Sequence, residues 1–336
     1  MVIVDEISSF RNHKSQRYKA LRKVRPFIKR IIGLTGTPTS SSSALMDLWS
    51  EVSLLDMGKR LGRFISRYRE TYFQPGQYNP YTGVVYSYEL LPGAKEKIYE
   101  KIADMTISMK ALDYLDMPEK VIVQHEAVMD KAERRLYDEM KRDLVASIDG
   151  EDITATNAAV LSGKLLQMAS GAVYNEDHDI IEIHDKKLLM LEDLIEQANG
   201  QKVLIAYYFK HDHERIMRHL TELGYSPRDV KTSEDIDAWN DPDSDFTIGL
   251  ISPQSAGHGL NLQKSEAHIL IYFSQIWSLE LVQQTNARLW RQGQKNTVTI
   301  HHIICKDTVD EDVMRALENK NTTQQSLINA VKARLT

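Results

Sequence analysis

The sequence has 336 residues, of which 42% are hydrophobic and 26% charged, and its formal net charge is −5. This composition is ordinary for a globular protein and excludes a disordered or fibrous chain, and the length predicts about two domains. No apolar run approaches the ~20 residues that cross a bilayer, and the first residues lack the basic start and cleavage site of a signal peptide. Cys305 is the only cysteine, which excludes an intramolecular disulfide framework and a cysteine-cluster zinc site. We therefore expect a cytoplasmic protein that makes no contact with a membrane.

The N-terminal third contains only two runs that are typical of strands, residues 2–4 and 31–34. The rest of this third, to about residue 115, has a mostly helical pattern, which a Gly-, Pro- and Tyr-rich loop at 74–83 interrupts. Two strands do not make a self-sufficient parallel sheet, because such strands need covered faces and neighbours at their edges. We therefore expect residues 1–115 to be the partial, helix-rich remainder of a first domain.

Residues 11–30 contain nine lysines and arginines and no acidic residue. Such a run is usually a solvated helix face. Alternatively it is a nucleic-acid surface, whose phosphate contacts would make binding sensitive to salt and independent of base sequence. The net charge gives no global sign of nucleic-acid binding, so both interpretations stay open.

From residue 116 onward the pattern alternates between strands and helices. Helix is disfavoured in the residue before Pro118, so we predict a second domain over 116–336, with a helical insertion near 131–170. Thr308 and Glu311 have the spacing of a capping box that opens a final helix. Alternating strands and helices indicate βαβ units on a parallel sheet with right-handed crossovers, an α/β fold. The predicted strands are 120–129, 203–209, 246–251, 268–273 and 297–305, and the predicted helices are 186–198, 211–223 and 280–291.

Polar segments follow both apolar runs of the N-terminal third. Asp5 and Glu6 come directly after the first run, at the strand end where α/β sheets bind ligands. One carboxylate can hold Mg²⁺ while the other polarises a water, although strands also often end in solvated acids. Thr35, Gly36 and Thr37 follow the second run, and their hydroxyls can relay hydrogen bonds unless the segment is a simple Thr/Gly turn.

A glycine-containing loop follows the predicted strand at 246–251. Gly257 and Gly259 lie in this loop, residues 252–262, and are separated by one residue. This spacing lets a backbone come close to a phosphate, with amides as donors. A tight turn at a strand end is the alternative.

The segment 283–294 is the most specific of the four. On a helix, Gln284, Arg288 and Arg291 lie at i, i+4 and i+7 and share one face. Two guanidiniums on one face repel unless they meet an anion, and their planar forks suit phosphate oxygens, as in an arginine finger. The alternative is a solvated amphipathic helix that packs its apolar side inward.

Taken in order, these segments resemble the motifs of the Swi/Snf-type branch of the superfamily-two helicases and translocases, with the small phage and bacterial members most similar. The ordered set covers nearly the whole chain. It implies RecA-like parallel-sheet lobes, a partial N-terminal one and a complete C-terminal one, that close on ATP and walk along double-stranded DNA. The matching segments are 5–8 (motif II), 11–15 (the basic segment after it), 34–38 (motif III), 48–50 with 54–55 (the Leu-Trp-Ser helix), 202–209 (motif IV), 252–262 (motif V) and 284–294 (motif VI).

The resemblance also implies roles for single residues. Asp5 would hold the metal, Mg²⁺, and Glu6 would activate the attacking water. Arg288 and Arg291 would reach the γ-phosphate of ATP. The other matching positions are Thr35 and Thr37, which would couple nucleotide state to lobe closure, Gly257 and Gln284, which would face the nucleotide, and Arg11, Lys14, Ser252, Gly259 and Asn261, which would contact DNA.

The sequence departs from the family at the phosphate loop. The Walker A pattern Gly-x4-Gly-Lys-Ser/Thr, whose amides and lysine hold the β- and γ-phosphates, occurs nowhere in the 336 residues. We therefore expect weak nucleotide binding and little ATP hydrolysis by the chain alone, and a separate polypeptide carrying the Walker A half as its partner.

Three hypotheses follow. The first is an ATP-dependent DNA translocase or helicase, completed by the missing half, in the cytoplasm of a prokaryotic or phage-infected cell. The second is a non-catalytic DNA-binding or interaction module derived from such a helicase. The third is a degenerate remnant that folds only in its C-terminal lobe. A Walker A segment encoded directly upstream would separate the first hypothesis from the second.

Overall fold

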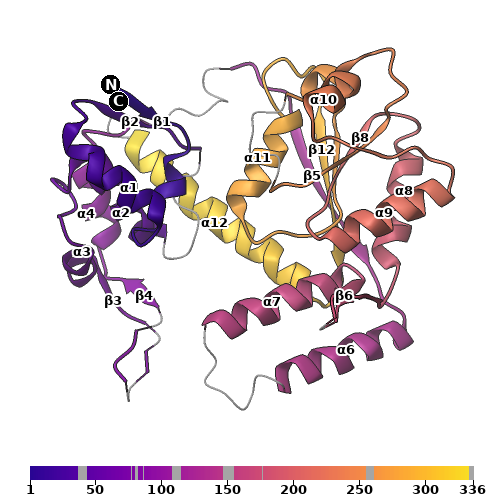
Figure 1. Ribbon diagram of the computed structural model, residues 1–336, viewed down its shortest axis with the longest axis horizontal. Helices are drawn as coiled ribbons and strands as arrows, with labels where there is room; N and C mark the ends of the chain where they lie inside the picture. The colour runs from indigo at the N-terminus through magenta and orange to yellow at the C-terminus, as the bar shows by residue number, and fades with distance from the viewer. Residues whose placement is uncertain are drawn as a thin grey trace. The chain divides into compact units, whose positions relative to one another are not determined.

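The computed structural model describes residues 1–36, 44–76, 78–79, 82–85, 87–107, 115–146, 155–175, 177–254 and 261–332. Only the backbone is described at 44, 143–146, 155–159 and 321–332. The chain divides into two compact units, Met1–Met109 with Glu318–Thr336, and Lys110–Leu317. Figure 1 gives the order of the elements, and each unit is described by itself.

The first unit combines a short parallel strand pair with helices. β1 and β2 pair in parallel, Val4 opposite Gly33, and β3 and β4 form an antiparallel pair. The core is aromatic: Trp49, Tyr68 and Ile98 are almost completely buried within one cluster. The elements are β1 Val2–Val4, a 3-10 turn Ile7–Phe10, α1 Gln16–Val24, a 3-10 turn Arg25–Phe27, β2 Ile31–Gly33, α2 Ala44–Asp56, α3 Ile65–Tyr72, β3 Phe73–Pro75, β4 Tyr88–Leu90 and α4 Ala94–Ile102.

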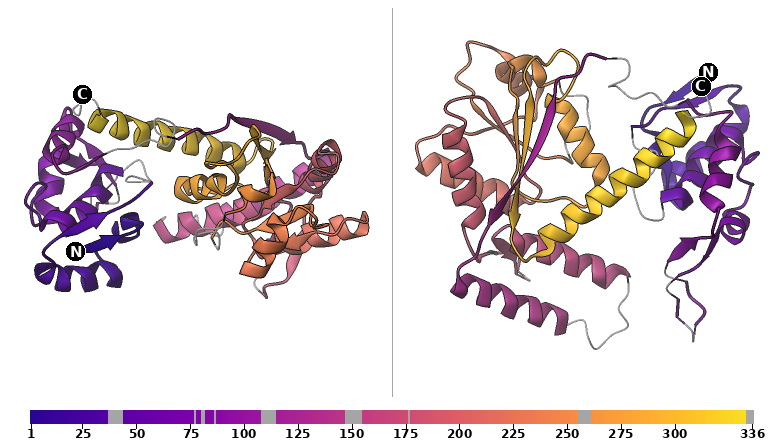
Figure 2. Two further views of the ribbon diagram at one scale, coloured as in Figure 1. Left: turned by 90° about the horizontal axis from the view of Figure 1, so that it is seen from above. Right: turned by 180° about the vertical axis from the view of Figure 1, so that it is seen from behind.

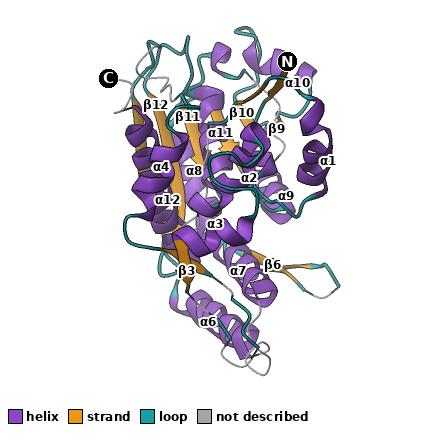
Figure 3. Ribbon diagram, turned by 90° about the vertical axis from the view of Figure 1, so that its left-hand side faces the viewer, coloured by secondary structure: helices purple, strands orange, loops and turns teal. Residues whose placement is uncertain are grey.

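The second unit is built on a six-stranded parallel sheet, in the order β5-β12-β11-β8-β10-β9. In Figure 3, the labelled strands β12, β11, β10 and β9 appear in this order across the sheet, and β8 lies between β11 and β10. The strands are β5 Lys120–Ala127, β8 Val203–Ala206, β9 Arg228–Asp229, β10 Ile248–Ile251, β11 Ile269–Tyr272 and β12 Val298–Cys305.

Helices cover both faces of this sheet. Alternate strand residues point to opposite sides, and apolar residues on both sides pack against helices. Leu204 and Leu270 pack in one cluster with α10 Ser233–Asn240 and α11 Leu279–Leu289. Their neighbours Ile205 and Ile271 pack in another with α8 Lys186–Gln197 and α9 Lys210–Glu222. The middle strands are therefore buried on both sides and consist of continuous apolar residues, as expected of a parallel sheet. Figures 1 and 2 show the resulting layers.

Three further α-helices, a hairpin and a 3-10 turn, Gln263–Ser265, are described in the second unit. α6 Lys131–Ala146 and α7 Ala155–Ala169 lie side by side (Figures 1 and 2) and correspond to the helical insertion predicted near 131–170. β6 Ala172–Tyr174 and β7 Ile180–Glu182 pair antiparallel. α12 Val309–Lys332 begins here, and from Glu318 it is grouped with the first unit.

The predicted α/β fold class with a parallel sheet is confirmed, with differences at several ends. The strand predicted over 203–209 ends at Ala206, because Phe209 already caps α9 and donates its N–H to Asp212. The loop predicted at 74–83 is wrong in its first residues, since Gln74 and Pro75 belong to β3. The serine-rich loop at 40–43 lies outside the described residues.

The final helix begins where predicted, with a shifted cap. The Thr308 hydroxyl accepts from the N–H of Asp310, not Glu311. The Glu311 carboxylate accepts from the N–H of Asp307, one residue before the expected one, at 2.9 Å. The two side chains still satisfy amides at the helix start, which is what a capping box does.

Candidate functional site

The carboxylates of Asp5 and Glu6 lie at the carboxyl end of β1. Asp5 is exposed and Glu6 is partly exposed. Glu6 has a left-handed backbone (φ 52°, ψ 58°) that ends the strand sharply, and its N–H donates to Asp5 Oδ1 at 3.1 Å. The Ser8 hydroxyl lies 3.4 Å from Glu6 Oε2. The turn thus holds two adjacent carboxylates at the end of a strand, that of Asp5 exposed and that of Glu6 partly exposed.

Backbone hydrogen bonds bring Thr35 to the same edge. Leu34 N–H donates to Val4 O and Ile7 N–H donates to Leu34 O, both at 2.9 Å. The approach is close, since a Cβ at Gly33 would lie 2.6 Å from Ile7 Cδ1. Gly33 and Ile7 were missed as positioning residues, because nothing in the sequence shows that they meet. Thr37 lies outside the described residues.

The basic run predicted to contact DNA begins beside this edge. The Arg11 Nε donates to Ser8 O at 2.8 Å, so its guanidinium is tied to the turn that carries Glu6. Lys14 is exposed. The run continues into α1, where Ser15 accepts from Tyr18 N–H as the N-cap and Tyr18 packs inward. The remaining lysines and arginines at 17–23 are exposed.

In the second unit, the predicted DNA and nucleotide loop follows β10. Ser252 is partly exposed and Pro253 is buried at the strand end. Gly257 and Gly259 lie outside the described residues. Asn261 is exposed, and its carbonyl accepts from Asn240 Nδ2 at 2.9 Å, which fixes the end of the loop against α10.

The three residues predicted on one helix face divide between α11 and the segment after it. Gln284 and Arg288 lie on α11, but the helix ends at Leu289, so the prediction that Arg291 shares their helical face is wrong. Trp290 leaves the helical conformation (ψ 84°), and its Nε1 donates to Pro118 O at 2.8 Å. This anchor redirects the chain and leaves Arg291 exposed.

Arg291 instead links the two predicted segments of the second unit. Its Nη1 donates to Asn261 Oδ1. The side chains of segments 252–262 and 283–294 are therefore joined, although 30 residues separate them in sequence. No local pattern could have predicted this pair.

The electrostatics around Arg288 favour an anion. Arg288 is 7% exposed, and burial, followed by repulsion from Arg291, lowers the pKa of its guanidinium. Two neighbouring cations that raise each other's energy are stabilised by a ligand with several negative oxygens. Gln284, one turn before Arg288, is partly exposed.

Asp5 and Glu6 fit a metal that is shared with a phosphate ligand. Within the described ranges there is no group of three or more His, Cys, Asp or Glu side chains that could hold a metal ion by themselves. Mg²⁺ commonly takes one or two protein carboxylates and completes its shell with water and phosphate oxygens. The exposed Asp5 carboxylate suits that arrangement.

The fold and these strand-end residues define an α/β protein of the parallel-sheet class. No model of a known protein family matches the sequence. The chain is 35% identical over 346 aligned residues to putative protein p41 of Acyrthosiphon pisum secondary endosymbiont phage 1, covering 98% of this chain and 72% of p41. It is 24% identical over 329 residues to the uncharacterized ATP-dependent helicase MG018 of Mycoplasma genitalium, covering 95% of this chain and 30% of that helicase.

A third relative is a DNA repair and recombination protein. The chain is 31% identical over 99 residues to the RAD54-like DNA repair and recombination protein of Drosophila ananassae, covering 30% of this chain and 12% of that protein. The crystal structure of the C-terminal part of the Fun30 ATPase domain is similar with a TM-score of 0.46 at 16% identity, covering 66% of this chain and 99% of that one.

The chain belongs to the Swi/Snf-type branch of the superfamily-two helicases and translocases. It spans less than a third of the length of the Mycoplasma and Drosophila relatives. None of the described helices is both long enough and apolar enough to span a membrane.

Proposed function

We propose that this chain supplies part of an ATP-driven motor that moves along double-stranded DNA. Residues 1–115 would contribute to the first RecA-like lobe and residues 116–336 would form the second. The observation that carries the proposal is the pair of guanidiniums at Arg288 and Arg291, because burial and mutual repulsion make this pair suited to phosphate.

The first unit would supply the carboxylates of the reaction. Asp5 would bind Mg²⁺, which neutralises charge on the phosphate oxygens when bound. Glu6 would orient and polarise the attacking water, and the hydroxyl of Ser8 beside Glu6 Oε2 supports that carboxylate. Thr35 lies at the same strand edge, from which it would report nucleotide state, together with Thr37.

The second unit would supply the arginines. Phosphoryl transfer needs positioning and charge stabilisation rather than covalent chemistry, and arginines on the γ-phosphate provide both. Arg288 is held by its burial on α11, and Arg291 by its bond to Asn261. Gln284 would order the same side, and Gly257 would approach the nucleotide.

DNA would be held by phosphate contacts from both units. Arg11 and Lys14 open the basic run of the first unit, and Ser252, Gly259 and Asn261 belong to the loop after β10. Such contacts bind independently of base sequence and weaken as salt rises. The RAD54-like relative is named as a DNA repair and recombination protein. We extend action on DNA to this chain as part of the proposal.

A complete ATP site also needs a phosphate loop, and no Walker A pattern occurs in the 336 residues. The loop would come from another segment, of the same polypeptide or of a separate one. These 336 residues alone would then bind Mg²⁺ and ATP weakly. They would act, in the cytoplasm, only together with that segment.

The test is ATP hydrolysis with duplex DNA, measured with and without a polypeptide that carries the phosphate loop of a family member. We expect turnover only when both are present. Arg288→Gln should then lower turnover by about a thousandfold, because arginines on a transferring phosphoryl group contribute on that order. Arg315→Gln is the matched control, since that arginine is exposed on α12 and pairs with Asp312.

Turnover that Arg288→Gln leaves unchanged would contradict the proposed role. Salt-sensitive DNA binding without turnover in any combination would favour the second hypothesis, a non-catalytic DNA-binding module. The missing Walker A pattern is the observation that favours this second function.

A further inference from the structure

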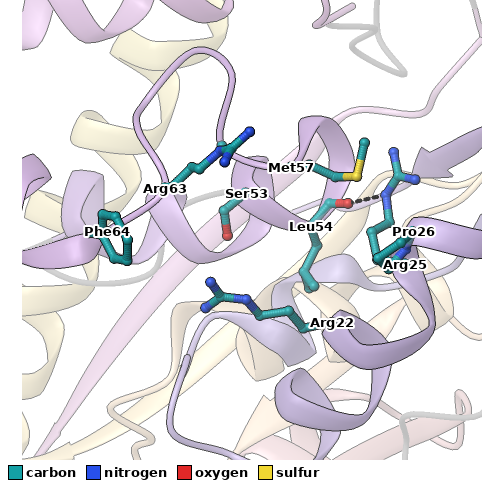
Figure 4. A pocket seen from close by; sticks show the side chains of 9 residues that line it. Arg22, Arg25, Pro26, Ser53, Leu54, Met57, Arg63 and Phe64 are labelled. Atoms are coloured by element: carbon teal, nitrogen blue, oxygen red, sulfur yellow. Dashed lines mark hydrogen bonds between the residues drawn. The ribbon is translucent and has the colours of Figure 1, made fainter.

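A pocket of about 220 Å³ lies wholly within the first unit, between α1, α2 and the segment before α3. Figure 4 shows the side chains that line it, with Ser53 between Arg22 and Arg63 in this view. Three arginines and no acidic residue line the pocket, and its apolar wall includes Leu54, Met57 and Phe64. We propose that this pocket binds a phosphate of single-stranded nucleic acid, with a base stacked on Phe64.

Arg22 and Arg63 differ from the third arginine of the pocket in their contacts. Neither forms an ion pair within the part of the chain that the structure describes, and Arg22 only approaches the Tyr18 ring, at 5.9 Å. The third arginine, Arg25, donates to three backbone carbonyls and is buried. The neighbouring Asp56 carboxylate accepts the amides of residues 58–60. Two guanidiniums therefore remain for an anion.

The surroundings indicate a polyanion and not a single acidic group. Arg22 lies on α1, whose exposed lysines and arginines continue the positive surface away from the pocket. A strand held by one phosphate in the pocket would carry further phosphates nearby, and the exposed lysines and arginines of α1 would supply charge for them. A backbone with regularly spaced charges satisfies this arrangement better than one carboxylate.

The apolar wall selects a single strand. Phe64 is 67% exposed and Met57 is 45% exposed, so both large apolar side chains offer surface to a ligand. The bases of a duplex are stacked on one another, whereas an unpaired base offers its face to an aromatic ring. This inference goes beyond the proposed motor and does not depend on ATP hydrolysis.

The test is fluorescence anisotropy of the full chain without ATP, using a labelled oligothymidylate of about 20 nucleotides and a duplex of equal length. Arg22→Gln with Arg63→Gln should weaken binding of the single strand about tenfold. The slope of log K against log salt should become shallower by about 0.7, since the two arginines hold one phosphate and each lost phosphate contact removes about 0.7 for single strands. Arg67→Gln, an exposed arginine on α3 outside the pocket, should change affinity less than about twofold.

Phe64→Leu separates stacking from charge. It should weaken binding of the single strand about tenfold and leave the duplex within about twofold, because it keeps every charge. Circular dichroism and thermal melts check that each variant folds. The proposal is overturned if Phe64→Leu affects both nucleic acids equally or neither, or if polyglutamate of equal charge competes as well as the oligonucleotide, which would make the pocket a site for acidic polypeptides. This binding experiment does not involve ATP hydrolysis, so its outcomes leave the proposed motor function unaffected.

Discussion

His302 on β12 is a buried polar residue at the centre of the second unit. Its ring stacks on Tyr272, with ring centres 4.6 Å apart, and its Nδ1 lies 2.9 Å from Gln275 Oε1. Gln275 Nε2 donates to Ile303 O, so Oε1 is the atom that faces the histidine and the neutral ring donates from Nδ1. Burial, with smaller contributions from His301 and Lys187, lowers the pKa of His302 to about 4.

This lowered pKa predicts acid sensitivity. The unfolded chain protonates the ring near its ordinary pKa of 6.5, while the folded protein resists until about 4. The stability that depends on a neutral ring is thus complete above pH 6.5 and is lost as pH falls towards 4, by up to about 1.4 kcal/mol per pH unit for one proton. His302→Phe should lower the free energy of unfolding at pH 7.5, because Gln275 loses its donor. Its pH dependence between 6.5 and 4.5 should be shallower by up to that amount.

Urea unfolding at several pH values measures this slope. His178→Asn is the control for loss of one exposed ring, and Asn suits the left-handed backbone at that position (φ 66°). If His302→Phe keeps the slope of the unsubstituted protein, the acid sensitivity comes from other groups.

At the scale of elements, Arg25 closes the C-terminal end of α2. Its Nε donates to Leu54 O and its Nη2 to Leu55 O, both at 2.5 Å, while its Nη1 donates to Ile28 O at 2.8 Å. The last turn of α2 has no basic residue of its own, so Arg25 supplies the cation that its carbonyls favour. The planar fork makes all three bonds together, which an ammonium cannot do.

Arg25→Lys should therefore destabilise the first unit by about 3 kcal/mol, since two charge-assisted hydrogen bonds are lost. Hydrogen exchange of amides in α2 measures the change in stability. Arg22→Lys is the control, because this arginine is exposed and lies three residues earlier, and it should lower the stability by at most about 0.5 kcal/mol. If Arg25→Lys costs as little stability as Arg22→Lys, the positive charge at position 25 is sufficient, and the planar guanidinium fork does not stabilise the end of α2.

The elements differ in how far the sequence could predict them. The middle strands were predictable because a parallel sheet buried on both faces requires continuous apolar runs, as in β8, β10 and β11. The hairpins β3–β4 and β6–β7 have three-residue strands, too short for a period to appear. The carboxylates of Asp5 and Glu6 were placed at a strand end correctly. The bond from Arg291 to Asn261 and the contact of Ile7 with Gly33 depend on tertiary packing, which no local pattern contains.

At the scale of the whole molecule, the two units have separate cores of different size. The cluster of the first unit surrounds Trp49 and Ile98, and its parallel strands β1 and β2 have three residues each. The second unit has a six-stranded sheet with a buried cluster on each face. Units with their own cores can unfold separately, and the smaller core is expected to be the weaker.

We therefore expect calorimetry of the full chain to show two transitions, with the first unit unfolding at the lower temperature. Ile98→Ala removes a fully buried side chain of the first unit and should lower the first transition, at a cost of about 2–5 kcal/mol. Leu204→Ala is its counterpart in the second unit and should lower the second transition by a similar free energy. Hydrogen exchange in increasing urea assigns each transition, because amides of α4 should open before those of β8. One transition whose calorimetric and van't Hoff enthalpies agree, and which both substitutions lower, would instead mean that the chain folds as a single cooperative unit.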